Sequence, residues 1–162
     1  MGADGIGAAV RRKEDVRFLT GRGTYTDDIA RMGQTHAHIV RSSQAHARIK
    51  RIDASKAKAA PGVVAVFTGA DMAADGVGGL PCGWLVKNKD GSPMKEPAHP
   101  PLVVDCVRHV GDQIAVVIAE TRSQARDAAE LVEIEFESLP AVADSLDALK
   151  AGAPQVHGDA VP

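Results

Sequence analysis

The sequence predicts an α+β fold in which a mixed β-sheet carries a few helices on one side. The main observation is a strand–helix–strand pattern between Gly111 and Pro140. Residues 114–119 are a continuous apolar, mostly β-branched run, which is typical of a strand covered on both faces. Residues 132–136 alternate apolar side chains with glutamates, which is typical of a half-buried strand. The strand order does not follow from these patterns.

The helix between these two strands has a start signal and an apolar face. Thr121 and Gln124 form a T-x-x-Q capping box, which can satisfy free amides at a helix start. Ala125, Ala128 and Ala129 follow at helical spacing, with charged residues on the opposite side. Such small side chains allow a helix to lie close against a sheet.

Composition limits the classes of function. A chain of 162 residues with 44% hydrophobic and 25% charged residues suits one globular domain. A net charge of −2 and only 3% aromatic residues give no reason to expect nucleic-acid binding. No apolar run reaches the roughly 20 residues of a membrane span, and residues 1–15 do not have the pattern of a secretory signal. Cys82 and Cys106 have no close cysteine partner, so we expect reduced thiols and a cytoplasmic protein.

Residues 1–30 are predicted to form an N-terminal extended segment. Gly5-Ile6-Gly7 lacks the third glycine, the strand and the helix of a dinucleotide-binding loop, so no cofactor is assigned to it. Gly21 and Gly23 suggest unusual backbone conformations. Neighbouring side chains in an extended chain point to opposite faces, so Asp27 and Asp28 favour a turn or a cap over a catalytic pair.

The main domain is predicted over residues 31–150, and its first part contains the best metal candidates. Residues 36–41 and 48–52 are predicted strands, joined by a turn near Ser43, with Ile52 out of phase as at a bulge. His36 and His38 share one strand face and His46 lies near the turn. Two strand histidines leave the ligand set of a zinc site incomplete, so these are weak candidates beside a structural or interface role.

The middle of the chain alternates short elements with one long loop. Ser55 is expected to cap a helix over residues 55–60, before a buried strand over 63–67. Thr68 and Asp71 resemble a cap for a further turn. Residues 74–101 are rich in glycine and proline and form a long loop, followed by a strand over 102–110 that ends near His109. His109 could act as a general base, but it lacks a nearby nucleophile or orienting acid in the sequence.

Long loops inside compact domains are uncommon and are often functional. Trp84 and Leu85 lie in this loop without an obvious local core. They are candidates for a partner interface, and the alternative is that they hold the loop against its own domain.

Many short motifs in order resemble one known domain. The chain resembles the N-terminal a/b hammerhead domain of the molybdopterin-binding large subunit in the xanthine dehydrogenase, aldehyde oxidase and aerobic carbon monoxide dehydrogenase family. The matching stretches lie within residues 12–28, 36–53, 61–63, 107–111, 119–121, 128–130 and 139–142. The Arg17-Phe18-Leu19-Thr20-Gly21 motif is closer in style to the bacterial carbon monoxide dehydrogenase-like branch than to the animal enzymes.

The resemblance implies an oxidoreductase in which water supplies oxygen and a molybdenum–pterin centre accepts two electrons. It implies iron–sulfur and FAD-containing partner subunits that carry the electrons away. It also implies that the cofactor and the catalytic residues belong to domains beyond this segment, toward which residues 151–162 would lead. We therefore assign no catalytic or cofactor-binding residue to this chain, and we expect the segment alone to be inactive.

Two functions from different classes remain open. The first is a structural domain that packs beside the molybdenum-cofactor domains, on the same chain or a separate one, and contacts the iron–sulfur and flavin subunits. The second is a stand-alone binding module, which could hold a metal through His36, His38 and His46. The sequence does not name a substrate.

Overall fold

The structure, a computed structural model, describes residues 12–158. Residues 1–11, which include Gly5-Ile6-Gly7, and residues 159–162 lie outside the described part. The chain divides into two compact units, Met1–Gln34 and Thr35–Pro162.

The described part of the first unit contains short helical turns. Helix α1 (Asp15–Leu19) and the 3-10 helix η1 (Thr26–Asp28) interrupt the segment that the sequence predicts as extended. Asp28 has the predicted capping role, because its carboxylate accepts a hydrogen bond from the Tyr25 N–H at 2.9 Å. Gly21 has a φ of 68°, in the left-handed region that favours glycine, whereas Gly23 does not adopt a positive φ.

The second unit contains two three-stranded sheets. One sheet has the order β1-β5-β3, from β1 (His36–Arg41), β5 (Gln113–Ala119) and β3 (Val63–Thr68). The other has the order β4-β2-β6, from β4 (Cys106–Val107), β2 (Ala47–Asp53) and β6 (Glu133–Ser138). The α+β class is confirmed, but the strands form two sheets, and each of their pairs is antiparallel.

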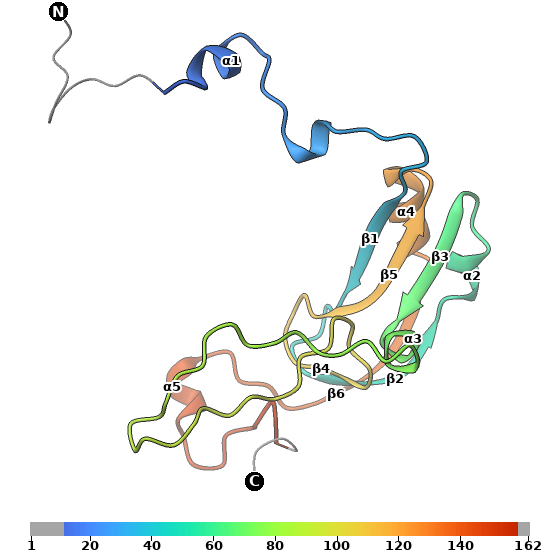
Figure 1. The fold of residues 1–162 in the computed structure, drawn as a ribbon. Helices are drawn as coiled ribbons and strands as arrows, with labels where there is room; N and C mark the ends of the chain where they lie inside the picture. Colours follow the sequence, from blue (N-terminus) through green and yellow to red (C-terminus); the bar gives the residue numbers. More distant parts are fainter. Residues whose placement is uncertain (1–11, 159–162) are drawn as a thin grey trace, which may run out of the picture. The chain divides into compact units, whose positions relative to one another are not determined.

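Strands that follow one another in the sequence do not pair in these sheets. The chain turns after β1, so that β2 lies in the other sheet (Figure 1). In the same way, β5 lies in the first sheet and β6 in the second. The predicted bulge in β2 is confirmed by a register shift between Ile49 and Arg51 opposite β6. The two sheets are therefore each assembled from segments that are distant in sequence.

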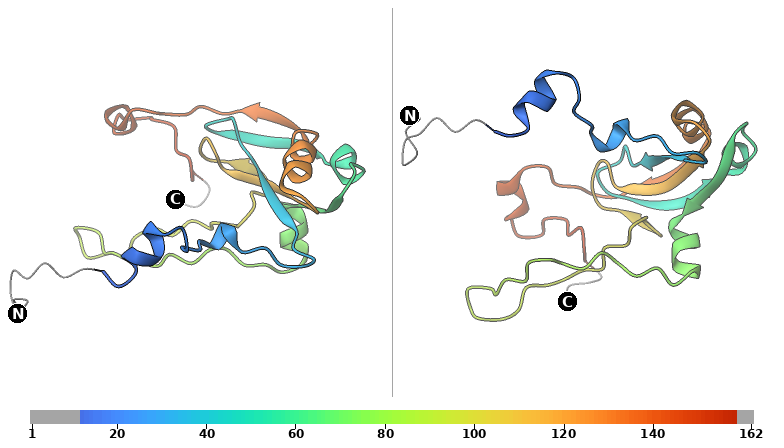
Figure 2. Two further views of the ribbon diagram at one scale, coloured as in Figure 1. Left: turned by 90° about the horizontal axis from the view of Figure 1, so that it is seen from above. Right: turned by 45° about the horizontal axis from the view of Figure 1, so that its top comes forward.

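Helix α4 (Arg122–Ala129) packs against β1 and β5 and forms the main helical cover of the first sheet (Figure 2). The predicted cap is confirmed, since Thr121 Oγ1 accepts a hydrogen bond from the Gln124 N–H at 3.2 Å. The predicted small face is also confirmed, because Ala125, Ala128 and Ala129 are buried. Short helices α2 (Ser55–Lys58) and α3 (Gly69–Ala74) contact β3.

The buried residues form two clusters. Val66 and Val117 meet α2 and α4 in the first, and Val107 and Ile114 meet Val103 in the second. Ile114 and Val117 lie on the central strand β5, whose continuous apolar run is buried as predicted. β5 therefore contributes to both clusters.

Two local predictions are wrong. Ser55 does not cap α2: the N-cap is Ala54, and the Ser55 N–H instead donates to Asp53 Oδ1 at 3.0 Å. The predicted strand over residues 102–110 is reduced to β4. Leu102, Val103 and Val107 are buried, but the segment makes isolated backbone bonds, such as Val103 N–H to Gln113 O at 2.7 Å, outside a continuous ladder.

The residues between α3 and β4 form the predicted long loop, which extends away from the sheets (Figures 1 and 2). Its tip is closed by a bridge between Lys87 and Pro93. The last helix, α5 (Ser145–Ala148), follows β6. In residues 12–158, none of the helices is long and apolar enough to cross a membrane.

Candidate functional site

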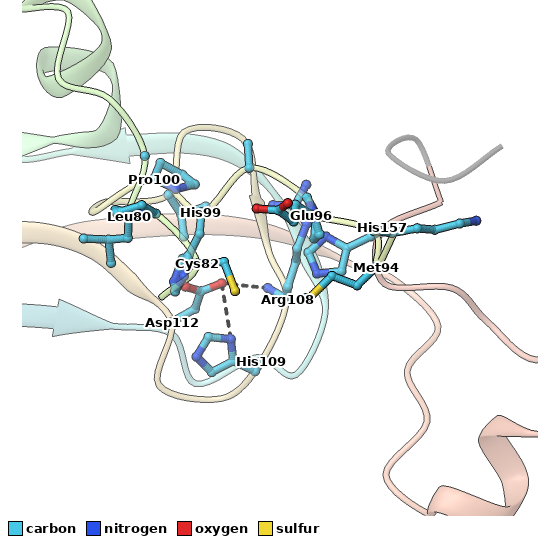
Figure 3. A pocket seen from close by; sticks show the side chains of 16 residues that line it. Leu80, Cys82, Met94, Glu96, His99, Pro100, Arg108, His109, Asp112 and His157 are labelled. Carbon is cyan, nitrogen blue, oxygen red and sulfur yellow. Dashed lines mark hydrogen bonds and ion pairs between the residues drawn. The ribbon is translucent and has the colours of Figure 1, made fainter. Parts of the chain in front are cut away.

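A cavity of about 630 Å³ lies between the long loop and the turn that joins β4 to β5 (Figure 3). Loop residues 79–82 and 94–100 form one wall, and residues 103–112 form the other, with His157 also at the edge. The lining combines apolar groups with titratable ones. Because its residues come from separate stretches of sequence, no local pattern predicts this cavity.

Asp112 fixes the inner wall of the cavity. Only 9% of its surface is exposed, and its Oδ2 accepts a hydrogen bond from the Arg108 backbone N–H at 2.9 Å. The backbone of Asp112 accepts a further bond from the Ser42 N–H at 2.8 Å, and Gly111 donates back to Ser42 O at 2.8 Å. Asp112 thus joins the turn before β5 to the corner after β1.

Arg108 extends beside Asp112 and has unused donor capacity. Its Nη1 donates to the Cys106 carbonyl at 3.0 Å, whereas its Nε is buried without a hydrogen bond to the residues that the structure describes. Within residues 12–158, no carboxylate forms an ion pair with the Arg108 guanidinium. A buried donor without an acceptor is costly.

His109 lies two residues beyond β4, at the outer side of the same cavity. Its Nδ1 is 3.7 Å from Asp112 Oδ2, a pair that is ionic only when the imidazole is protonated. Figure 3 shows dashed lines from Asp112 to both Arg108 and His109. The sequence leaves His109 without an orienting acid, and the structure supplies Asp112 in that position, with the His109 side chain still 63% exposed.

The predicted interface residues lie at the tip of the long loop. Trp84 is 80% exposed and Leu85 is 63% exposed, so they do not hold the loop against its own domain. The loop around them is internally ordered: Met94 N–H donates to Val86 O at 3.1 Å, and Leu80 N–H donates to His99 O at 2.7 Å. The loop therefore presents large apolar side chains to the outside on a defined turn.

A second exposed apolar surface, absent from the sequence analysis, lies on α5. Leu146 is 72% exposed and Leu149 is 83% exposed. The helix starts at Asp144, whose Oδ1 accepts hydrogen bonds from the Leu146 and Asp147 N–H groups at 2.8 and 3.1 Å. In the sequence, an aspartate before Ser-Leu-Asp-Ala is a helix-capping signal that could have predicted this helix.

The three candidate histidines are not brought into a metal site. His36 and His38 lie on β1, opposite Ala119 and Val117. His46 Nδ1 is 2.9 Å from the Pro140 carbonyl oxygen, a contact that ties the start of β2 to the end of β6. Across residues 12–158, no three His, Cys, Asp or Glu side chains gather into a group that could hold a metal ion.

The outer face of the second sheet carries paired charges. Lys50 Nζ is 2.8 Å from Glu137 Oε2, and Arg48 is 3.5 Å from the same oxygen. The hydrogen bond from Lys50 is the main cause that lowers the pKa of Glu137, and Glu133 raises the pKa of Lys56 in a similar pair. These exposed pairs satisfy one another and contribute little to stability.

The fold and the cavity define a small α+β domain with exposed apolar side chains on its long loop and on α5. A sequence model described as aldehyde oxidase and xanthine dehydrogenase, a/b hammerhead domain, matches residues 20–140. The chain therefore belongs to this family, as its a/b hammerhead domain. The family resemblance in the sequence is confirmed.

Relatives and solved structures give the same assignment. The chain is 39% identical to the carbon monoxide dehydrogenase large chain of Afipia carboxidovorans, over 96% of this chain. It is 41% identical to the nicotine 6-hydroxylase large subunit of Paenarthrobacter nicotinovorans, over 95% of this chain. The crystal structure of Cu,Mo-CO dehydrogenase superposes with a TM-score of 0.78 at 38% identity, covering 98% of this chain and 18% of that one.

The matched region is a minor part of these relatives. The chain spans 18% of the length of both the carbon monoxide dehydrogenase and the nicotine hydroxylase chains. The segment is thus a domain of large subunits in this family of oxidoreductases, and it accounts for only a fraction of such a subunit.

Proposed function

We propose that this chain serves as the structural hammerhead domain of a molybdenum hydroxylase large subunit and is inactive by itself. The observation that carries the proposal is the near-complete match of this chain to only 18% of the carbon monoxide dehydrogenase large chain. The domain would pack beside cofactor-binding domains, whether these belong to the same polypeptide or to a separate one. The two sheets of this domain would provide a rigid surface against which those domains pack.

The proposal places the molybdenum–pterin cofactor outside residues 12–158. One relative, 35% identical, is named a xanthine dehydrogenase molybdenum-binding subunit from Escherichia coli. The described residues do not fit the cofactor: Asp112 is already held by the Arg108 and Gln113 N–H groups, and no three His, Cys, Asp or Glu side chains in residues 12–158 gather into a group that could hold a metal ion. We therefore assign this chain no chemical step on the molybdenum. When bound elsewhere in the subunit, the cofactor would accept two electrons while water supplies oxygen.

Iron–sulfur and FAD-containing subunits are proposed as the partners that carry these electrons away. One relative, 42% identical, is named as subunit gamma of a 6-hydroxypseudooxynicotine dehydrogenase complex, which supports an assembly of several subunits. Trp84 and Leu85 are the proposed contact with a neighbouring domain or subunit, since large exposed apolar groups on an ordered turn favour burial. The proposed location is the cytoplasm, where Cys82 and Cys106 would remain reduced.

The first test is the intact mass of the polypeptide that carries this sequence in its source cell, together with its molybdenum content. We expect a mass several times 16.9 kDa and stoichiometric molybdenum. A mass of 16.9 kDa with a co-purifying molybdenum-containing chain would support the version with a separate partner. A chain of that mass that co-purifies with no molybdenum-containing polypeptide would overturn the proposal.

A second test addresses the apolar loop tip in the native complex. We expect the double variant Trp84→Ser/Leu85→Ser to weaken retention of a separate subunit that the tip contacts, measured by size-exclusion chromatography with light scattering. The matched control is Val64→Ser, which changes another exposed apolar residue, 60% exposed, on β3. If the unsubstituted protein, the double variant and the Val64→Ser control all elute with the same mass, Trp84 and Leu85 are not part of that interface.

A further inference from the structure

We propose that the cavity around Arg108 receives a carboxylate-bearing segment of the same large subunit, from outside residues 12–158. The inference rests on the proposed function and adds the chemistry of the contact. It assigns Arg108 as the recognition group, and the wall formed by residues 79–82 and 94–100 as a cover for the incoming segment. The occupant is a polypeptide segment, and its contact group is a side-chain carboxylate.

The free edge of the Arg108 guanidinium has the geometry for a carboxylate. Nη1 is already used by the Cys106 carbonyl, and Nε is buried without an acceptor in the described residues. The Nε and Nη2 groups lie on the same edge, where two parallel N–H donors match the two oxygens of a carboxylate. One incoming carboxylate would satisfy the orphaned donor and balance a cation that lacks an ion-pair partner in residues 12–158.

The two acidic groups in the cavity do not supply this partner. Asp112 is held by the backbone N–H groups of Arg108 and Gln113, at 2.9 and 3.1 Å, and it lies beside the His109 imidazole. Glu96 also lines the cavity, on the long loop, without an ion pair to Arg108. The guanidinium therefore keeps its capacity for an acceptor from outside.

The apolar part of the cavity favours a polypeptide over a small anion. Leu80, Pro97, Pro100 and Val103 line it alongside the polar groups, and about 630 Å³ accommodates several side chains. The exposed Trp84 and Leu85 continue the apolar surface along the same loop. An apolar surface around a charged anchor is the usual anatomy of a protein interface.

The length of the relatives indicates where the segment comes from. This chain matches 18% of the carbon monoxide dehydrogenase large chain, so about four fifths of that protein folds outside the matched region. A segment of the same subunit is present at high effective concentration, which favours its binding over a separate molecule. The binding of such a segment to the cavity would not depend on which substrate the enzyme uses.

The test uses the complete native subunit and the thiol of Cys82, which lines the cavity. Cys82 is exposed in the domain alone, so we expect the incoming segment to protect it from a maleimide reagent, measured by peptide mass spectrometry. Arg108→Met is expected to speed labelling about 10- to 100-fold, the range that loss of one charged hydrogen bond gives. Hydrogen exchange should rise in residues 79–100 and in one segment outside residues 12–158.

Three comparisons keep the test specific. Arg126→Met, at an exposed arginine on α4, should leave Cys82 labelling unchanged. Arg108→Lys should give an intermediate rate, because lysine keeps the charge and loses the paired donors. Continued protection of β5 amides in every variant would show that the domain remains folded.

The proposal fails if Cys82 of the complete subunit reacts as fast as a free cysteine peptide. It also fails if protection of Cys82 disappears on dialysis while hydrogen exchange outside residues 12–158 stays unchanged, which would indicate a small anion. Loss of Cys82 protection on dilution would indicate a second copy of the chain and would likewise contradict the proposal. In these cases a large native mass with molybdenum would still support the proposed function. A native polypeptide of 16.9 kDa that co-purifies with no molybdenum-containing polypeptide would instead remove the function on which the inference rests.

Discussion

Asp112 shows how one side chain can hold a corner of this fold. Its carboxylate accepts backbone N–H groups from Arg108 and Gln113, and its carbonyl accepts from Ser42. We expect Asp112→Ala to lower the free energy of unfolding by about 1–3 kcal/mol, because it leaves two partly buried N–H groups without their acceptor. Urea unfolding of the purified protein followed by circular dichroism measures this change.

The matched control for that substitution is Asp105→Ala. The Asp105 side chain is exposed, and the residue contributes to the fold through its carbonyl, which accepts from Ile49 N–H at 2.7 Å. Surface substitutions of this kind usually change stability by less than about 0.5 kcal/mol. Equal unfolding midpoints for the two variants would contradict the structural role of the Asp112 carboxylate.

Gly69 is required by space. A Cβ atom at this position would lie 2.2 Å from the Val103 carbonyl oxygen, so backbone would have to move. We expect Gly69→Ala to destabilise the protein by about 1–3 kcal/mol, the usual cost of overpacking. Thermal unfolding compares it with Gly78→Ala, where no atom lies within 4 Å and φ is not positive; a melting temperature equal to that of the control would refute the steric requirement.

Elements with local signals could be predicted from the sequence. The cap of α4 by Thr121 and the alternation of β6 depend on residues a few positions apart, and both are present in the structure. The segment over residues 102–110 carries the composition of a strand, yet only Cys106–Val107 pairs. Val103 and Val107 are buried by tertiary packing against Ala47 of β2 and Ile114 of β5, whereas Val104 and Val110 stay exposed. Composition alone does not distinguish such packing from strand pairing.

The cap of α3 gives a pH-dependent prediction. The Thr68 hydroxyl, and then the Thr68 backbone N–H, hold the pKa of Asp71 below its ordinary value of 3.8. Because the folded pKa is lowered, this cap contributes stability above pH 3.8 that is lost as the pH falls through the folded pKa. NMR titration should place the Asp71 pKa below 3.8 and show that Thr68→Val moves it upward, since valine removes the hydroxyl donor and keeps the N–H. Identical titration curves for the two proteins would show that the Thr68 hydroxyl does not lower this pKa.

At the scale of the whole molecule, the arrangement of strands could not be predicted from local patterns. His36 on β1 faces Ala119 on β5, and Ala47 on β2 faces Ser138 on β6. Hydrophobic periodicity specifies which face of a strand is buried but does not identify its neighbour. The cavity could not be predicted for the same reason, because the long loop and Arg108 are distant in sequence and are brought together by the tertiary fold.

The stand-alone metal-binding alternative has a direct whole-molecule test. We expect the purified native protein to contain the same amount of each metal before and after the double substitution His36→Ala/His38→Ala, because these side chains are not grouped with a third ligand in residues 12–158. Inductively coupled plasma mass spectrometry measures the metal content. Loss of one stoichiometric metal ion on substitution would revive the metal-binding function.

The division of neighbouring strands between two sheets has a consequence during synthesis on the ribosome. β1 cannot pair until β5 has emerged, about 80 residues later, which takes roughly 4–16 s at ordinary elongation rates. β2 likewise cannot form its ladder with β6, which is longer than its ladder with β4, until β6 has emerged. Until β4 and β5 emerge, the apolar segments of β1, β2 and β3 have no native strand partners. Chaperones that bind extended chains would then have their longest access to this part of the nascent chain.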